Sequence, residues 1–144
     1  MYWDTSALLK LYVAENDSGY FIGLIAKSDQ AIVCSAISAI EILCALYRKE
    51  RNRELKPGSA KAALQRFRAD SVAGRMVIVP YGEDVIAAAA KIVEQAYLSA
   101  QPVMLRSLDA IHMASATIVG SKIMVVTDAR LRDVAAMARM LVLP

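Results

Sequence analysis

Four acidic residues stand in segments that are otherwise apolar, and they are the side chains of this sequence best placed to do chemistry. Glu41 is the only charged residue between positions 31 and 47, and Asp109 is the only carboxylate in a long apolar helical stretch. Asp4 follows Met-Tyr-Trp, and Asp128 follows Ile-Met-Val-Val-Thr. Burying an unpaired ionised carboxylate is heavily penalised, so each one needs a cation, a hydrogen-bond donor or a water-filled cleft.

Carboxylates without accompanying histidine or cysteine clusters favour hard, oxygen-binding cations such as Mg²⁺ or Mn²⁺. Ions of this kind keep several of their waters and bind substrate phosphates. The pattern therefore predicts phosphodiester chemistry rather than peptide or ester hydrolysis. One ion would lower the pKa of a bound water for in-line attack, and a second would steady the leaving oxygen.

Each acid also has a structural explanation. Asp4 and Asp128 lie between a strand and a helix, where aspartate is a common N-cap. Asp109 is near a helix start and could be held by the helix dipole, and Glu41 could pair with a buried arginine. We expect that the four are not all structural at once, because two of them lie at strand ends, where α/β sites form.

Short apolar runs alternate with helical stretches along the whole chain. The expected strands are 1–3, 31–34, 75–79, 122–127 and 141–143. The expected helices are 5–14, 18–27, 36–53 (with Ser35 as N-cap), 60–70, 83–99, 107–119 and 129–140. Strands separated by helices imply right-handed crossovers and a mainly parallel sheet covered on both faces. We predict an α/β protein, a three-layer α/β/α sandwich with a mainly parallel central sheet, in which residues 1–144 form a single domain.

Composition places this domain in an ordinary cytoplasmic setting. Of its 144 residues, 57% are hydrophobic and 22% are charged, and the charges interrupt every apolar run before it reaches the ~20 residues needed to cross a bilayer. No secretory signal pattern is visible at the start. Cys34 and Cys44 have no CxxC spacing and only one histidine elsewhere, so we expect reduced core cysteines rather than a zinc site.

Four segments resemble the PIN domain, and more narrowly the VapC-type toxins of bacterial toxin–antitoxin pairs. The segments are WDTSALLKLYVAE (3–15), SAISAIEILCALYR (35–48), SLDAIHMASA (107–116) and VVTDARL (125–131). Their order and spacing match the family from one end of the chain to the other. The resemblance implies a parallel α/β/α sandwich, Mg²⁺- or Mn²⁺-dependent endoribonuclease activity on RNA, frequent homodimerisation, and inhibition by a cognate antitoxin.

The resemblance also implies roles for individual residues. The four family acids, which serve as metal ligands and catalytic residues, fall on Asp4, Glu41, Asp109 and Asp128. The small hydroxyl residue after the first acid falls on Thr5 or Ser6, which would hold a metal-bound water. Many relatives place Thr or Ser two residues before the last acid, whereas this chain has Val126 there and Thr127 next to Asp128. Thr127 either substitutes for that residue or the contact is absent, which makes Asp128 the least secure ligand.

Other residues have both a functional and a structural interpretation. His112 lies three residues after Asp109, and we favour a core-edge histidine with a hydrogen bond over a general base or metal ligand. Eight basic residues between 48 and 68 would guide RNA, dock an acidic antitoxin segment, or simply face solvent. Arg130 and Arg132 could neutralise the acids or contact phosphate.

Two rival functions remain open at this point. A phosphoryl-transfer enzyme with a nucleophilic Asp4 would normally show a DxD pair, but position 6 is Ser6. A non-catalytic α/β interaction module would use the acids only as caps and ion pairs. It predicts that Mg²⁺ and Mn²⁺ leave the thermal stability unchanged.

Overall fold

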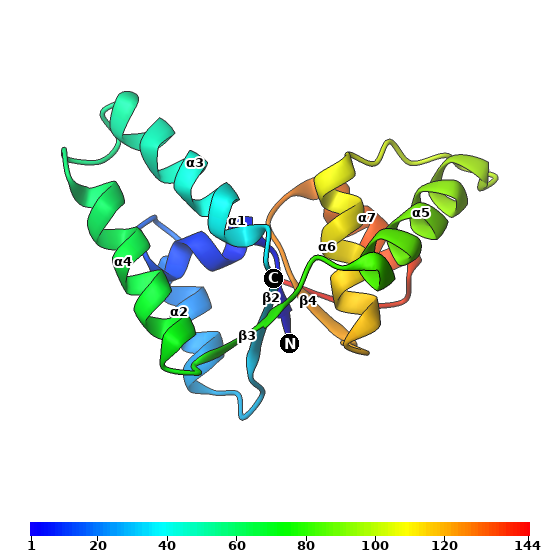
Figure 1. Ribbon diagram of the computed structural model, residues 1–144, viewed down its shortest axis with the longest axis horizontal. Coiled ribbons are helices and arrows are strands. Elements are labelled where there is room, and N and C mark those ends of the chain that lie inside the picture. The colour runs from blue at the N-terminus through cyan, green and yellow to red at the C-terminus, as the bar shows by residue number, and fades with distance from the viewer.

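The computed structural model describes residues 1–144, which form a central sheet with helices on both sides (Figure 1). The sheet has five strands, all parallel, in the order β3-β2-β1-β4-β5. The strands are β1 Tyr2–Trp3, β2 Ile32–Ser35, β3 Met76–Val79, β4 Ile123–Val125 and β5 Leu141–Leu143. The all-parallel sheet agrees with the predicted α/β class.

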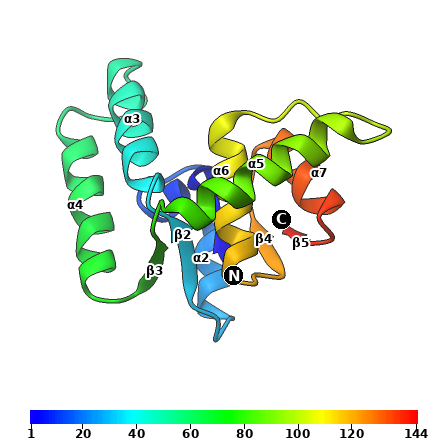
Figure 2. The same ribbon diagram turned by 45° about the vertical axis from the view of Figure 1, so that its right-hand side comes forward.

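Seven α-helices and one 3₁₀ turn connect the strands. They are α1 Thr5–Leu8, the 3₁₀ turn η1 Leu9–Leu11, α2 Ser18–Ala26, α3 Ser38–Arg51, α4 Ser59–Val72, α5 Glu83–Leu98, α6 Ser107–Ile118 and α7 Ala129–Met137. Helices α1 to α4 lie on one side of the sheet, and α5, α6 and α7 lie on the other, as both views show (Figure 1, Figure 2). The three-layer prediction is therefore confirmed.

The two halves of the core follow from the alternation of side chains along β1. Trp3 is fully buried among residues of α1 to α4, whereas Tyr2 is fully buried among residues of α6, α7 and β4. Successive side chains of a strand point to opposite faces, so a two-residue strand in the middle of the sheet serves both layers. Its backbone pairs with β2 on one side and β4 on the other.

Three predicted helix boundaries were wrong. The first helix ends at Leu11 rather than residue 14, because Ser18 holds the following turn: its Oγ donates to the Val13 carbonyl (3.1 Å) and accepts from the Glu15 amide (2.9 Å). The helix predicted over 129–140 ends at Met137. There Arg139 takes a left-handed φ of 59°, and the Met140 amide bonds to the Ala135 carbonyl, as in a Schellman cap.

The third correction concerns the helix predicted over 36–53 with Ser35 as its N-cap. It spans Ser38–Arg51 instead, and Ile37 occupies the cap position without a side-chain bond. The Ala36 amide donates to the Val79 carbonyl of β3 (2.9 Å), so the chain still follows the sheet at that point. Ser35 lies at the end of β2. Its hydroxyl accepts from the Ile37 amide at a long distance of 3.4 Å.

Two smaller features concern the cysteines and the length of the helices. Both cysteines are free, but only Cys34 belongs to the core, where burial raises the pKa of its thiol to about 12. Cys44 is exposed, so the prediction of two core cysteines was wrong for this residue. None of the helices has the length and apolar character needed to cross a membrane.

Candidate active site

All four acids singled out from the sequence line one open cavity of about 370 Å³. The residues around it come from four separate segments of the chain and are mostly polar. They are Asp4, Thr5, Ser6, Leu9, Lys10, Glu15, Glu41, Ala45, Arg48, Arg106, Asp109, Thr127 and Asp128. The predicted hydroxyl residues Thr5, Ser6 and Thr127 are among them.

The topology explains why the cavity lies here. From β1 the chain adds β2 and then β3 toward one edge of the sheet. It then returns to place β4 on the other side of β1 and β5 at the opposite edge, so the strand order reverses between β1 and β4. Asp4 directly follows β1, and Asp128 stands three residues beyond β4. Parallel α/β sheets bind ligands outside the carboxyl ends of their strands at such a reversal.

Asp4 and Asp128 are both N-caps, as the structural explanation of these residues requires. Asp4 Oδ2 accepts from the Ser6 amide (2.8 Å) at the start of α1. Asp128 Oδ1 accepts from the Arg130 and Leu131 amides (3.0 and 3.3 Å) at the start of α7. In each case the cap uses one carboxylate oxygen, and the other oxygen faces a cationic side chain described below.

Ser6 and Thr127 link the two strand ends. The Ser6 hydroxyl accepts a hydrogen bond from the Thr127 amide (3.1 Å), and the Asp4 amide donates to the Val125 carbonyl (2.9 Å). These contacts fix the turn after β1 against the turn after β4. Ser6 therefore fastens the backbone, and its neighbour Thr5 is the hydroxyl that contacts an acid of the cavity.

Glu41 meets a buried histidine rather than the arginine considered from the sequence. Its Oε2 lies 2.7 Å from His112 Nε2 and accepts a hydrogen bond from Thr5 Oγ1 (2.5 Å). The other ring nitrogen of His112 is hydrogen-bonded to the Tyr2 hydroxyl (2.7 Å), and Nε2 also lies 3.4 Å from Asp4 Oδ1. With 1% of its surface exposed, His112 is a hydrogen-bonded core histidine, as favoured, and it also contacts two of the predicted acids.

His112 and the two acids that face it, Glu41 and Asp4, stabilise each other's charges. Burial by itself lowers the pKa of His112, but the hydrogen bond to Glu41 and the negative charge of Asp4 outweigh it, so the pKa is raised. Burial raises the pKa of Glu41, but the hydrogen bond and charge of His112 and the bond from Thr5 outweigh it, so that pKa is lowered. Burial and nearby Asp4 raise the pKa of the Tyr2 phenol, which stays neutral. Both directions favour a protonated His112 beside an ionised Glu41.

Asp109 and Asp128 share a single arginine. Arg106 Nε and one terminal nitrogen bind the two oxygens of Asp109 at 2.8 and 3.1 Å, and the same terminal nitrogen lies 2.9 Å from Asp128 Oδ2. Asp109 is 5% exposed, whereas the Arg106 side chain is 51% exposed. Burial raises the pKa of Asp128, but the Leu131 amide and Arg106 outweigh it, so the pKa is lowered.

Sequence reasoning missed Arg106 and Tyr2. It offered Arg130 and Arg132 as neutralising cations, but Arg132 donates to the Val126 carbonyl (3.1 Å) and neither residue forms an ion pair with an acid. One signal was available: Arg106 stands three residues before Asp109, the spacing of neighbours on a helix surface. No signal in the sequence linked Tyr2 to His112, because the sheet and α6 bring them together across 110 positions.

The donor set of the cavity suits a hard divalent cation, although the acids are also paired within the protein. Four carboxylates and the Thr5 hydroxyl face the cavity without any thiolate, and oxygen donors of this kind are what Mg²⁺ and Mn²⁺ prefer. Glu41 is bonded to Thr5 and His112. Asp109 and Asp128 are bonded to Arg106. As placed, no three acidic, histidine or cysteine side chains lie close enough to share one ion.

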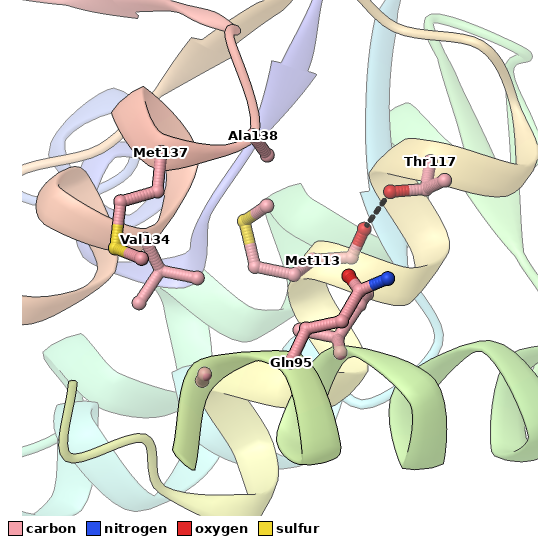
Figure 3. A pocket seen from close by; sticks show the side chains of 8 residues that line it. Gln95, Met113, Thr117, Val134, Met137 and Ala138 are labelled. Atoms are coloured by element: carbon pink, nitrogen blue, oxygen red, sulfur yellow. Dashed lines mark hydrogen bonds between the residues drawn. The ribbon is translucent and has the colours of Figure 1, made fainter. Parts of the chain in front are cut away.

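A second cavity, of about 350 Å³, has a different character (Figure 3). It lies between α5, α6 and α7, and Met113, Val134 and Met137 supply much of its surface. Its only side chains with hydrogen-bonding groups are Gln95 and Thr117, and the Thr117 hydroxyl donates to the Met113 carbonyl (2.8 Å). None of the residues that line this cavity has an ionisable side chain.

The basic stretch between 48 and 68 forms a helical hairpin from α3 and α4 (Figure 1). Lys49 pairs with Glu15 (2.9 Å) and Glu54 (3.0 Å), and Arg66 donates to the Tyr12 carbonyl. The remaining members are exposed and make no ion pair: Arg48, Arg51, Arg53, Lys56, Lys61 and Arg68. Only Arg48 reaches the acidic cavity.

Comparison with known protein families gives one match, to the PIN domain, over residues 1–137. Comparison with curated protein sequences gives no significant match. The PIN match includes all four acids, His112 and Arg106, so it covers the whole cavity.

Solved structures of toxins and toxin–antitoxin complexes share this fold. VapC20 of Mycobacterium tuberculosis, described as a sarcin–ricin loop cleaving toxin, matches with a TM-score of 0.72 and 19% identity, over 99% of this chain and 98% of that one. VapBC2 of Rickettsia felis, bound to a promoter DNA fragment, matches with a TM-score of 0.69 and 11% identity, over 98% of this chain and 95% of that one. FitAcB of Neisseria gonorrhoeae matches with a TM-score of 0.66 and 18% identity, over 99% of this chain and 96% of that one.

Proposed function

Because the chain belongs to the PIN domain family, whose members are nucleases, we propose that it is a metal-dependent endoribonuclease and the toxin of a toxin–antitoxin pair. The observation that carries the proposal is the cavity at the strand reversal, which is lined by four carboxylates from four separate segments. An acidic cavity repels a polyanion, so it suits RNA only with cations between the carboxylates and the phosphate. The fold shared with VapC20, a sarcin–ricin loop cleaving toxin, supports RNA as the substrate.

The residues of the cavity have distinct parts in this proposal. Asp4, Asp109 and Asp128 would hold Mg²⁺ or Mn²⁺, and the bound ion would supply positive charge for the phosphate and make a water more acidic. Glu41, kept ionised by His112, accepts a proton from a water in the cavity, and Thr5 orients that carboxylate. Ser6 and Thr127 fix the two strand ends on which Asp4 and Asp128 stand.

The test is RNA cleavage by the purified protein with Mg²⁺ or Mn²⁺ and with EDTA. We expect Asp4→Asn and Asp109→Asn to lower the cleavage rate by at least about a hundredfold, since each removes negative charge needed to hold the cation. Asp70→Asn is the matched control, because Asp70 binds Tyr12 and Arg75 away from the cavity. If both active-site variants cut RNA as fast as the parent, the nuclease proposal is wrong.

The partners are part of the same proposal. The fold is shared with a toxin–antitoxin complex of Klebsiella pneumoniae (TM-score 0.60, 16% identity, 88% of this chain and 85% of that one), which supports an antitoxin partner. The proposal includes a homodimer, and Ile40, Leu98, Met104 and Leu108 are exposed apolar side chains that a protein interface would cover. Light scattering on the purified chain, alone and with the product of a neighbouring short gene, tests both partners.

One observation favours the alternative of a non-catalytic interaction module: each acid already has a partner within the protein. Under that alternative the cavity has no affinity for divalent ions. A ligand that binds only the folded state raises the unfolding temperature. A clear rise in the unfolding temperature with millimolar Mn²⁺, lost in Asp109→Asn, would exclude the alternative.

A further inference from the structure

Arg106 occupies a position that a cation bound by the acids would also need. Its guanidinium binds both oxygens of Asp109 and one oxygen of Asp128, so three short contacts tie together two carboxylates from α6 and the start of α7. A planar guanidinium matches this arrangement because its N–H groups are fixed in a fork. As long as these contacts persist, the guanidinium occupies one acceptor site on each oxygen of Asp109, and its positive charge repels an incoming metal ion.

The contacts can be broken without disturbing the fold. The Arg106 side chain is 51% exposed, so little apolar surface is lost when it swings into solvent. Its backbone stays in place, because the Arg106 carbonyl accepts from the Ala110 amide (3.0 Å) in the first turn of α6. Rotation about side-chain bonds is therefore enough, and such motions are fast at exposed positions.

The other basic residues of the cavity do not compete in this way. Lys10 binds Glu15 and Asp17, both at 2.7 Å, and touches none of the four acids. Arg48 lines the cavity but forms no ion pair. Arg106 is thus the only arginine or lysine that forms an ion pair with any of the four acids.

We propose that Arg106 is a built-in counter-cation that a divalent ion must displace from Asp109 and Asp128 in order to bind, so that Arg106 sets the ion concentration at which the site fills. This inference rests on the proposed metal-dependent function. Without an ion, Arg106 keeps two neighbouring carboxylates from repelling each other. With an ion, the guanidinium leaves, and the free energy of its contacts is subtracted from that of ion binding.

The experiment is a calorimetric titration of Mn²⁺ into the EDTA-treated, dialysed protein and its variants. Arg106→Gln should bind Mn²⁺ about fivefold more tightly than the parent, the change expected when a competing, half-exposed ion pair is removed. Arg106→Lys keeps the charge but loses the fork, so its affinity should fall between the two. If Arg106→Gln folds poorly, the Mn²⁺ affinity of Arg106→Lys tests the inference instead.

The matched control is Arg48→Gln, which removes the same charge from the same cavity but breaks no contact with an acid. Displacement predicts a change in its Mn²⁺ affinity of less than about twofold. Equal tightening in Arg48→Gln and Arg106→Gln would mean that only the overall charge matters, and would overturn the inference. Unchanged or weaker binding by Arg106→Gln would overturn it as well.

A second readout observes the displacement itself. In an NMR spectrum of arginine Nε–H groups, the Arg106 signal should move toward the position of a solvent-exposed arginine as Mg²⁺ is added. The midpoint of this shift should equal the midpoint of Mg²⁺ binding to the parent protein. If the parent binds Mg²⁺ while this signal stays fixed, only the present inference fails. If neither the parent nor Arg106→Gln binds either ion, the metal site of the proposed function fails with it.

Discussion

The cavity balances its two pairs of carboxylates in different ways. On the histidine side, Asp4 and Glu41 face His112, which is fully buried and held from behind by the Tyr2 hydroxyl. On the arginine side, Asp109 and Asp128 share Arg106, which is half exposed. A buried cation cannot leave without opening the core, whereas an exposed one leaves by rotating. The histidine side is therefore a fixed part of the fold, and the arginine side is the part that a ligand can change.

The largest expected effect comes from breaking the histidine side. His112→Ala removes the ring that binds Glu41, removes the hydrogen bond between that ring and the buried Tyr2 hydroxyl, and opens a cavity in the core. Removing one member of a buried, hydrogen-bonded ion pair usually costs several kcal/mol, so we expect a loss of about 3 kcal/mol in the free energy of unfolding. Urea denaturation measures it.

The matching change on the arginine side should cost much less. Arg106→Ala removes contacts that are half exposed to solvent, for which about 1 kcal/mol is typical. Urea denaturation of the two variants in EDTA gives the comparison directly. A loss for Arg106→Ala as large as that for His112→Ala would show that the two sides are not different in kind.

The histidine side should also give the stability a distinctive pH dependence. His112 has a pKa raised above 6.5, so its contribution is complete below pH 6.5 and is lost as the pH rises through the raised pKa. Glu41 has a pKa lowered below 4.5, so its contribution is complete above pH 4.5 and is lost as the pH falls through the lowered pKa. The stability difference between parent and His112→Gln should therefore be largest between pH 4.5 and 6.5.

Thermal or urea unfolding of both proteins from pH 4 to pH 9 checks this dependence. The parent should lose its advantage over His112→Gln as the pH rises toward 9. A difference that stays constant over the whole range would mean that His112 is neutral throughout and acts only by packing.

The smallest expected effect is the response to salt. Surface charges are screened at high ionic strength, and buried ones much less. The stability difference between parent and Arg106→Ala should shrink in about 1 M NaCl, while that between parent and His112→Ala should stay nearly unchanged. Equal salt sensitivity of the two differences would contradict the assignment of one buried and one exposed cation.

The fold and the acids were predictable because both rest on local patterns. Short apolar runs between helices predicted the five strands, and isolated charges in apolar segments such as 31–47 identified residues such as Glu41. The counter-charges were not predictable in the same way. His112 reaches Glu41 across 71 positions, and Arg106 reaches Asp128 across 22, so these pairs exist only once the sheet and α6 are assembled.

Helix ends were the other limit, and for a related reason. The end of the first helix depends on the Ser18 side chain, and the start of α3 depends on a bond from Ala36 to β3. These are contacts with residues outside the helix itself. Periodicity along one segment reports which face is apolar, but it does not report such outside partners.

The most direct test of the account is a crystal of the parent protein soaked in Mn²⁺, with anomalous scattering recorded at the manganese edge. The account predicts a manganese peak in the cavity beside the carboxylates of Asp4 and Asp109, together with Arg106 turned away from Asp109 into solvent. A cavity without a peak at millimolar Mn²⁺, with Arg106 still bridging Asp109 and Asp128, would contradict it.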